Sequence, residues 1–254
     1  MTKWIFVHNP KAAGTSMLDW LRPTDMTVCD TEGGSSTYDA LCDHSGVVPQ
    51  HGIAYEASRV LPKETFDTRY KFGFVRNPFD REVSIYASQC IAECKWDVSF
   101  ADWVKWRYDE AVVLDVESSD YDYQWNRGFC IRPQIGNFID PDGNSLMNFI
   151  GRYESIKQDW KIVADAIGLP SFSKLAYWNS SMREYDYRSY YTDDVVDIVT
   201  EAHHLDLVTF NYEFERGMVS RDINIPEDLK LDLPDTYNFY YQSGGRGAVV
   251  PFSA

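Results

Sequence analysis

Short apolar runs and helix-start signals alternate along the first third of the chain. Trp4–Val7 and Tyr70–Val75 are short and apolar, which predicts a buried strand at each place. A turn is expected over Pro10–Gly14 and a helix over Ser16–Leu21. The pair Asn77–Pro78 is typical of a helix cap and a first helical residue. Each strand is therefore expected to lead directly into a helix.

Two more strands are predicted, and helices dominate the later part of the chain. Met26–Cys29 predicts a further early strand, and Leu146–Tyr153 predicts a late one. Further helices are predicted over Ala54–Leu61, Ser99–Tyr108 and Ser155–Ile167, and after a cap at Thr192. Strands that alternate with helices favour an α/β protein with a central parallel sheet flanked by helices.

The length of the chain fits one domain of this kind. It has 254 residues, and no internal repeat, low-complexity run or Pro/Ser-rich linker marks a second domain. A single domain over residues 1–254 is therefore predicted, in which the tail 216–254 has no assigned role.

The segment after the first strand has the composition of a phosphate loop. Small residues between a strand and a helix direct backbone N–H groups and the positive end of the helix dipole at one point, where an anion binds. In ATP- and GTP-using P-loops a lysine follows the last glycine and a magnesium-holding hydroxyl residue comes next. Here Lys11 precedes Gly14, and the chain contains no Gly-Lys-Ser/Thr triplet. This order indicates a donor other than ATP–Mg.

The segment after the Tyr70–Val75 strand adds a second phosphate ligand. Arg76 lies at the carboxyl end of that strand, where ligands of open α/β sheets bind. Ser84 is eight residues further on, about two helical turns and roughly 10 Å from the cap. A guanidinium fork and a serine hydroxyl can therefore meet on one phosphate.

Together the two segments resemble the sulfotransferases that use 3′-phosphoadenosine 5′-phosphosulfate (PAPS), and among them the carbohydrate-type branch. A Pro-Lys-x-x-Gly-Thr-Ser loop holds the 5′-phosphosulfate in that family, and it is matched by Pro10, Lys11, Gly14, Thr15 and Ser16. An Arg-Asn-Pro-x-x-Arg-x-x-Ser-x-Tyr segment holds the 3′-phosphate, and it is matched by Arg76, Asn77, Pro78, Arg81, Ser84 and Tyr86. Shorter landmarks extend the resemblance over about residues 4–215: His51, Arg132–Gln134, Ile150–Glu154 and Tyr187–Tyr191.

The resemblance implies both a fold and an activity. The implied fold is a P-loop-like three-layer arrangement, and the implied reaction moves a sulfuryl group from PAPS to an acceptor hydroxyl of a carbohydrate or small alcohol. PAPS would be a co-substrate, and family chemistry requires no metal. The implied donor-binding residues are Lys11, Ala12, Ala13, Gly14, Thr15, Ser16, Arg76 and Ser84.

Sulfuryl transfer needs a base for the hydroxyl proton and a positive charge on the departing phosphate. A histidine titrates in the right range for the base. His51 aligns with the family's histidine ahead of the second motif, and His44 in the same loop or the carboxylate of Glu56 are the alternatives. Lys11 is expected to stabilise the leaving phosphate. His8, beside the phosphate loop, suits either a site role or a structural one.

The net charge and the aromatic content limit the classes of acceptor that are expected. The formal net charge of −15 argues against a nucleic acid and against a long sulfated polyanion, and favours a neutral or small acceptor. Aromatic residues make up 15% of the chain, and those around Trp96–Tyr123 and Tyr177–Tyr191 suit either an acceptor-binding wall or core packing. Arg183 and Arg188 lie in the second group, where they could hold a sulfated product.

Cysteine usage and hydropathy point to the cytoplasm. The five cysteines are an odd number without a Cys-x-x-Cys pair, which favours free thiols in a reducing compartment. No signal peptide is recognised, and no apolar run approaches the ~20 residues that cross a bilayer. A cytoplasmic protein without a membrane span is expected, and its oligomeric state is left open.

Two other functions remain as alternatives. A kinase or NTPase would show magnesium-dependent ATP hydrolysis. A non-catalytic binding protein for PAPS or its product 3′-phosphoadenosine 5′-phosphate (PAP) would bind the nucleotide without transfer to any acceptor.

Overall fold

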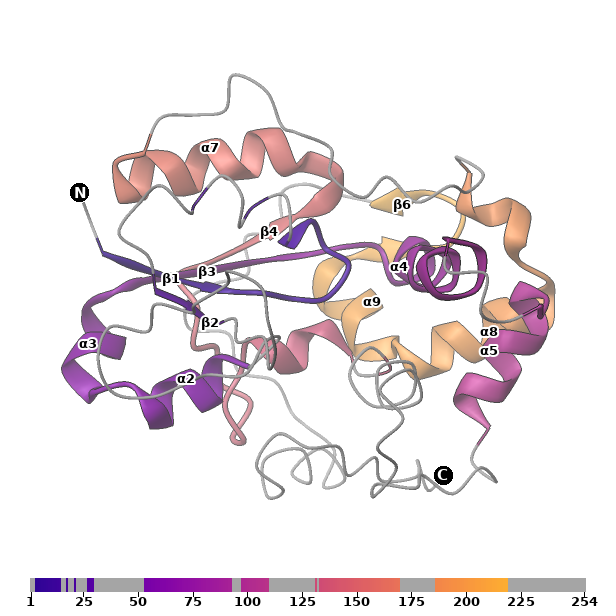
Figure 1. Cartoon of the computed structure of the whole chain (residues 1–254), viewed down its shortest axis with the longest axis horizontal. Coiled ribbons are helices and arrows are strands. Elements are labelled where there is room, and N and C mark those ends of the chain that lie inside the picture. Colours follow the sequence, from indigo (N-terminus) through magenta and orange to yellow (C-terminus); the bar gives the residue numbers. More distant parts are fainter. Residues whose placement is uncertain are drawn as a thin grey trace. The chain divides into compact units, whose positions relative to one another are not determined.

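The computed structural model (Figure 1) describes residues 3–14, 17, 21, 27–29, 53–92, 97–109, 131, 133–169 and 186–218. These residues fall into two compact units. The first unit contains the described residues up to Arg76 and those of 134–169, and the second contains the described residues of 77–133 and 186–218. The predicted extent of one domain over residues 1–254 stays a prediction.

A parallel sheet of four strands forms the centre of the first unit. The strands follow the order β2-β1-β3-β4, with bounds Trp4–Val7 for β1, Thr27–Cys29 for β2, Tyr70–Val75 for β3 and Phe149–Arg152 for β4. β1 pairs with β3 so that Phe6 lies opposite Phe72, and β3 pairs with β4 so that Phe72 lies opposite Phe149. The predicted strands Trp4–Val7 and Tyr70–Val75 are confirmed residue for residue.

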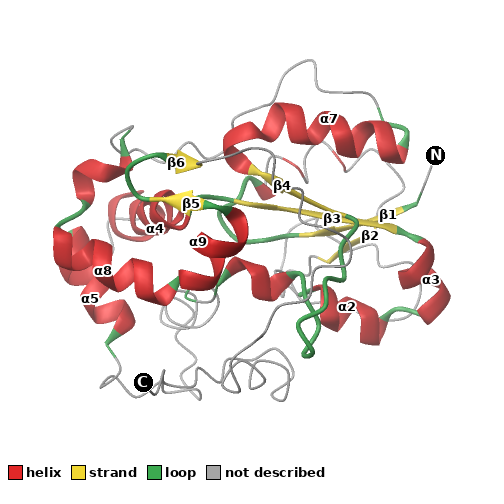
Figure 2. Ribbon diagram, turned by 180° about the vertical axis from the view of Figure 1, so that it is seen from behind, coloured by secondary structure: helices red, strands yellow, loops and turns green. Residues whose placement is uncertain are grey.

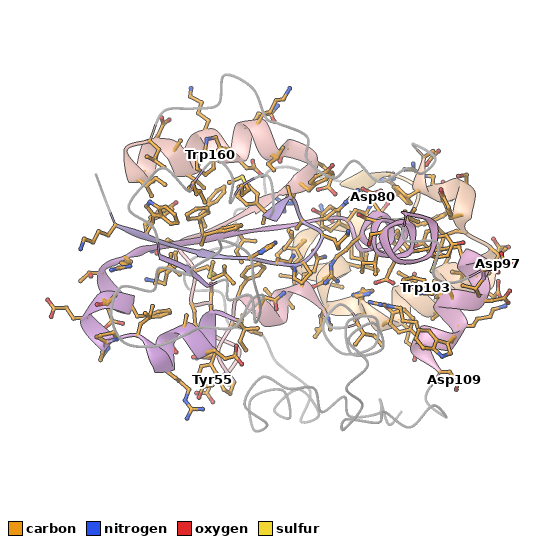
Figure 3. The ribbon with its side chains drawn as sticks, in the orientation of Figure 1. Tyr55, Asp80, Asp97, Trp103, Asp109 and Trp160 are labelled. Atoms are coloured by element: carbon orange, nitrogen blue, oxygen red, sulfur yellow. The ribbon has the colours of Figure 1, made fainter. Side chains whose placement is uncertain are left out.

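Alternating side chains on the strands send one apolar row towards helix α7 (Ile156–Ile167). This row is Trp4, Phe6, Phe72 and Phe74, and it packs against Trp160 of α7, which is labelled in Figure 3. The rings of Phe72 and Trp160 meet edge to face with centroids 6.2 Å apart. The apolar residues of α7 recur at helical spacing, so that one stripe of this helix covers the sheet.

The opposite face of the sheet carries the other row of side chains. Lys71 of β3 donates hydrogen bonds to the carbonyls of Phe66 and Arg69, and its ammonium lies over the Phe66 ring. Phe66 belongs to α3 (Lys63–Thr68), which follows α2 (Ala54–Val60). Figure 1 shows α7 on one side of the sheet and α2 with α3 on the other. The predicted parallel sheet flanked by helices is therefore confirmed, in three layers within this unit.

Local signals explain where some elements end. Gly168 closes α7 in the left-handed conformation at φ 77°, and the N–H of Leu169 then bonds the Ala164 carbonyl. β4 is shorter than the predicted Leu146–Tyr153, because Ser145 pairs with Ile139 in an isolated bridge and a 3₁₀ turn, η4 (Tyr153–Ser155), follows the strand. Helix α3 was not predicted at all.

Helices dominate the second unit (Figure 2). They are α4 (Pro78–Tyr86) with the π-helix η1 (Ala87–Ala92), α5 (Phe100–Tyr108), η5 (Tyr187–Tyr190), α8 (Asp193–Ala202) and α9 (His204–Phe210). A short hairpin of β5 (Tyr212–Glu213) and β6 (Gly217–Met218) follows. The Asn77 side chain accepts the Phe79 N–H and so caps α4, as predicted. None of the helices in the described part of the chain has the length and apolar character needed to cross a membrane.

Aromatic side chains form the core of the second unit. Trp103, labelled in Figure 3, is fully buried, and the Phe79, Tyr191 and Phe214 rings meet edge to face. The tyrosine hydroxyls donate to backbone carbonyls, Tyr187 to Phe214 and Tyr191 to Phe79. For these described residues of the tyrosine-rich segment, core packing is therefore the observed role.

A fully buried ionic cluster lies within this aromatic core. Arg107 Nε is 3.1 Å from Glu82 Oε2, and His203 Nε2 is 3.4 Å from Glu82 Oε1. His203 Nδ1 lies 3.6 Å from Asp206 Oδ2, while Tyr108 Oη is 2.8 Å from His203 Nε2. The two adjacent histidines differ in burial, since His203 is buried and His204 is exposed.

The protonation of His203 follows from its neighbours. Burial by itself would lower the pKa of His203, but the Asp206 and Glu82 carboxylates outweigh it and raise the pKa above its ordinary value of 6.5. Burial by itself would raise the pKa of Glu82, but Arg107 and His203 outweigh it and lower that pKa. A charged His203 thus lies between two buried carboxylates, and together with Arg107 it keeps the pKa of Glu82 low.

We expect the folded protein to lose stability on the alkaline side. A raised folded-state pKa gives stabilisation that is complete below 6.5, the ordinary value, and is lost as the pH rises through the folded-state value. His203→Gln should cost about 3–5 kcal/mol at acid pH, because it breaks a buried ionic cluster, and should abolish this alkaline loss. The free energy of unfolding, measured across this pH range, checks both effects.

The matched control is His204→Gln, since His204 is adjacent in sequence but exposed. It should keep the wild-type slope of stability against pH. An unchanged slope in His203→Gln would show that His203 is neutral in the folded state.

Candidate functional site

The order of the strands marks one position in the sheet of the first unit. The chain passes from β1 to β2 on one side and then to β3 on the other, so the direction of winding reverses between β1 and β3. Ligands of open α/β sheets bind outside the carboxyl ends of the strands at such a switch point. Among the described residues, three segments leave the sheet at this edge: His8–Gly14 after β1, Arg76 after β3 and Tyr153 after β4.

The loop after β1 has an unusual backbone. Lys11 and Ala13 have φ angles of 63° and 67°, in the left-handed region that residues other than glycine rarely adopt. Ala12 and Gly14 do not share it, so the sign of φ alternates over residues 11–14. Alternation of this kind turns successive N–H groups towards one concavity, the anion-binding arrangement called a nest. Each left-handed residue costs about 1–2 kcal/mol, which favours a functional reason for the conformation.

Packing beneath the loop holds this conformation. The Ala12 side chain is buried in the same apolar core as Met17, Leu21 and Trp160. The His8 ring stacks on Phe6 and lies so close to Gly14 that a Cβ at Gly14 would be 1.7 Å from His8 Nε2. Position 14 therefore admits only glycine while the imidazole is in place. His8 is 5% exposed, and in this geometry its ring packs against the loop at Gly14.

Arg76 joins the two predicted phosphate segments directly. Its Nη1 donates a hydrogen bond to the Lys11 carbonyl at 3.2 Å, although the residues are 65 positions apart. Its guanidinium also lies over the Tyr153 ring, 4.3 Å from the centroid. The side chain is held between the loop after β1 and the end of β4, and it is only 5% exposed. Two cationic residues, Lys11 and Arg76, are thereby placed together at the switch point.

A network of buried carboxamides supports this junction from the backbone side. Gln134 accepts the Arg76 N–H at 3.0 Å and donates to the Arg76 carbonyl at 2.7 Å. It also accepts from Asn9 Nδ2 at 2.8 Å, and Asn9 donates to the Phe74 carbonyl at 2.9 Å. Asn137 donates to Asn9 Oδ1 at 3.0 Å. These bonds tie the first residues of the phosphate loop to the end of β3.

Sequence reasoning missed the roles of Gln134 and Tyr153. Both were identified only as landmarks of the family resemblance, inside Arg132–Gln134 and Ile150–Glu154. Gln134 precedes Ile135, Phe138 and Ile139, whose apolar side chains were the available signal that this segment is buried.

The other predicted site residues have different outcomes. Lys11, Ala12, Ala13 and Gly14 come together with Arg76. Thr15, Ser16, His44 and His51 lie outside the described residues. Ser84 is buried on α4 in the second unit, so its meeting with Arg76 on one phosphate stays a prediction. Glu56 accepts the Ile53 N–H at 3.2 Å in the first turn of α2, where it acts in helix capping.

The donor set of this part of the molecule suits an anion. Across the described ranges, no three His, Cys, Asp or Glu side chains gather in a group that could hold a metal ion. The loop offers backbone N–H groups, and Lys11 and Arg76 offer charge. Such a combination fits phosphate or sulfate groups.

Comparison with known protein families identifies the family of this chain. A sequence profile described as the sulfotransferase family matches residues 44–213, more than half of the chain. This range contains His51, Arg76, Ser84 and Gln134 and begins after the phosphate loop. No match was found among the curated proteins.

One solved structure is also similar. It is the crystal structure of a sulfotransferase from Alicyclobacillus acidocaldarius, 13% identical, covering 80% of this chain and 96% of its own, with a TM-score of 0.39.

Proposed function

The chain belongs to the sulfotransferase family, and on that premise we propose that it moves a sulfuryl group from PAPS to the hydroxyl of a carbohydrate or small alcohol. The observation that carries the proposal is the bond between the Arg76 guanidinium and the Lys11 carbonyl. It brings an anion-binding loop and a buried arginine together at the switch point of the sheet. PAPS carries anionic groups at both its 5′ and 3′ positions, and therefore needs two such ligands.

The loop takes the 5′-phosphosulfate in this proposal. In the nest over residues 11–14, the Ala12 N–H bonds the Asn9 carbonyl, the N–H groups of Ala13 and Gly14 bind the anion, and the Lys11 side chain adds a full positive charge. Thr15 and Ser16 complete the segment that resembles the family's loop. Arg76 and Ser84 take the 3′-phosphate, which AMP and ATP lack.

The transfer itself requires an in-line approach. The acceptor hydroxyl oxygen attacks sulfur and forms a new O–S bond, while the bond from sulfur to the 5′-phosphate oxygen breaks and PAP leaves. His51 accepts the hydroxyl proton, and the Lys11 ammonium stabilises the negative charge that grows on the departing phosphate. No metal takes part in these steps.

The proposed class of acceptor is based on the net charge of the chain and on the contacts of Arg188. A net charge of −15 favours a neutral or small acceptor over a polyanion. Arg188 Nη1 donates to Asp186 at 2.9 Å, and Arg188 Nη2 donates to the Glu215 carbonyl. A sulfated product could use Arg188 only by displacing these partners.

The donor is tested by thermal shift. PAP should raise the melting temperature more than AMP or ATP does, because Arg76 and Ser84 bind the 3′-phosphate. A hundredfold excess over the dissociation constant stabilises the folded state by about 2.7 kcal/mol. Arg76→Ala should remove the preference for PAP, whereas Arg59→Ala should not, since Arg59 is an exposed arginine that also lies over a tyrosine ring. Equal shifts with PAP and AMP in the wild type would exclude this donor assignment.

Lys11 should act mainly on the chemical step. Lys11→Ala removes the ammonium but does not change the cost of φ 63° at position 11 much, since Ala and Lys both have a Cβ, so the loop should still bind the nucleotide. We expect a large fall in kcat with a modest change in PAP affinity, because the ammonium interacts mostly with charge that develops during transfer. Single-turnover kinetics and PAP titration separate the two. Lys63→Ala, at an exposed lysine, is the control. A parallel fall in affinity and turnover would make Lys11 a binding residue only.

The base is tested by substitution of His51, which precedes α2 in the sequence. His51→Ala should lower the rate by about two to four orders of magnitude and remove the acidic limb of the pH–rate profile, while PAP binding stays intact. His44→Ala should have a much smaller effect. A normal rate and profile in His51→Ala would transfer the role to His44 or Glu56.

A further inference from the structure

Gln134 is a fully buried polar residue of the first unit. It is 0% exposed, and its carboxamide makes three hydrogen bonds to two separate segments. It is neither a predicted donor ligand nor the predicted base. Buried carboxamides of this kind are maintained only where their bonds matter, because an unsatisfied polar group is costly.

Two of the three bonds replace a missing strand partner. β3 pairs with β4 only as far as Val75, which lies opposite Arg152. Arg76, the next residue, finds its partner for both the N–H and the carbonyl in the Gln134 side chain. The carboxamide thus imitates a neighbouring peptide group and fixes the backbone from which the Arg76 guanidinium projects.

The third bond extends the effect to the loop after β1. The oxygen that accepts the Arg76 N–H also accepts from Asn9 Nδ2. Asn9 begins the turn that leads into the left-handed residues Lys11 and Ala13, and the Ala12 N–H bonds its carbonyl. One side chain therefore sets the starting positions of both donor-binding segments.

We propose that Gln134 is a positioning residue of the donor site: its carboxamide holds the Arg76 guanidinium and the Lys11 loop in the arrangement that distinguishes a 3′-phosphate. The inference rests on the proposed function, because it assigns the 3′-phosphate to Arg76. Hydrogen bonds link the Gln134 side chain to the Arg76 backbone, and the Arg76 side chain to the Lys11 carbonyl.

The chain offers a matched control for a purely structural role. Asn148 is another carboxamide that bonds the β3 backbone, since its Oδ1 accepts the Lys71 N–H at 2.8 Å. Lys71 lies near the opposite end of β3, five residues or about 16 Å from Arg76 along an extended strand. Loss of the Asn148 bond affects the same strand but leaves the carboxyl edge of the sheet untouched.

The first experiment compares Gln134→Met with Asn148→Leu. Dissociation constants for PAP and for AMP are measured by calorimetry below the melting temperature of each variant. The wild type should prefer PAP, and Gln134→Met should weaken PAP binding by about tenfold or more, the scale of a lost charge-assisted contact. AMP binding should weaken less, because AMP uses the loop but lacks the 3′-phosphate that Arg76 binds. Asn148→Leu should keep the wild-type ratio of the two constants.

A second variant keeps the test decisive where Gln134→Met does not fold. In Gln134→Glu a protonated carboxyl can donate to the Arg76 carbonyl and accept from Arg76 N–H and Asn9, as the amide does. The ionised form instead places negative charge against the Arg76 carbonyl. PAP affinity relative to the wild type should therefore recover as the pH falls from about 8 to 5, while Gln134→Met stays low at every pH.

The outcomes distinguish a wrong donor from a wrong role for Gln134. If the wild type shows no preference for PAP over AMP, the proposed donor is wrong and the inference falls with it. If the wild type prefers PAP and Gln134→Met or ionised Gln134→Glu keeps the full preference, Gln134 only stabilises the fold and the positioning role is overturned.

Discussion

The parallel pairing of β1 with β3 is the constraint on which the candidate site depends. Because Val7 lies opposite Gly73, the segments that follow these strands leave the sheet at the same edge, and Lys11 and Arg76 can meet across it. The same pairing aligns Phe6 with Phe72 beneath α7, so the core of the first unit and the geometry of the site have one origin. A shift of one residue in this register would turn the aromatic row away from α7.

Packing and hydrogen bonds fix the geometry of the candidate site. The left-handed residues of the loop are energetically unfavourable, and they persist because Ala12 is anchored in the core and the His8 ring fills the space over Gly14. The neutral carboxamides of Asn9 and Gln134 fix the backbone without adding charge, and in the proposed function Lys11 and Arg76 are the cationic groups that bind the anionic donor. Fixed dipoles and charges of this kind need little reorganisation when charge develops during transfer.

The main feature of the second unit is a cluster of buried charged side chains. Its aromatic core contains Glu82, Arg107, His203 and Asp206, all fully buried, and these charges are tolerable only as mutual partners. They join α4 to α5 and to the junction of α8 with α9. Since α4 also carries Ser84, the protonation of His203 is coupled to the stability of a helix that holds a predicted donor ligand.

The sequence alone determined whatever depends on neighbouring residues. The apolar runs located β1 and β3, Asn77 and Gly168 marked helix ends, and two motifs indicated the sulfotransferase family. Tertiary structure decided the bond between Lys11 and Arg76, the role of Gln134 and the burial of His203. Helix caps and strand periodicity are local properties, whereas contacts over 58 or 65 positions exist only once the order and register of the strands bring separate segments to one edge of the sheet.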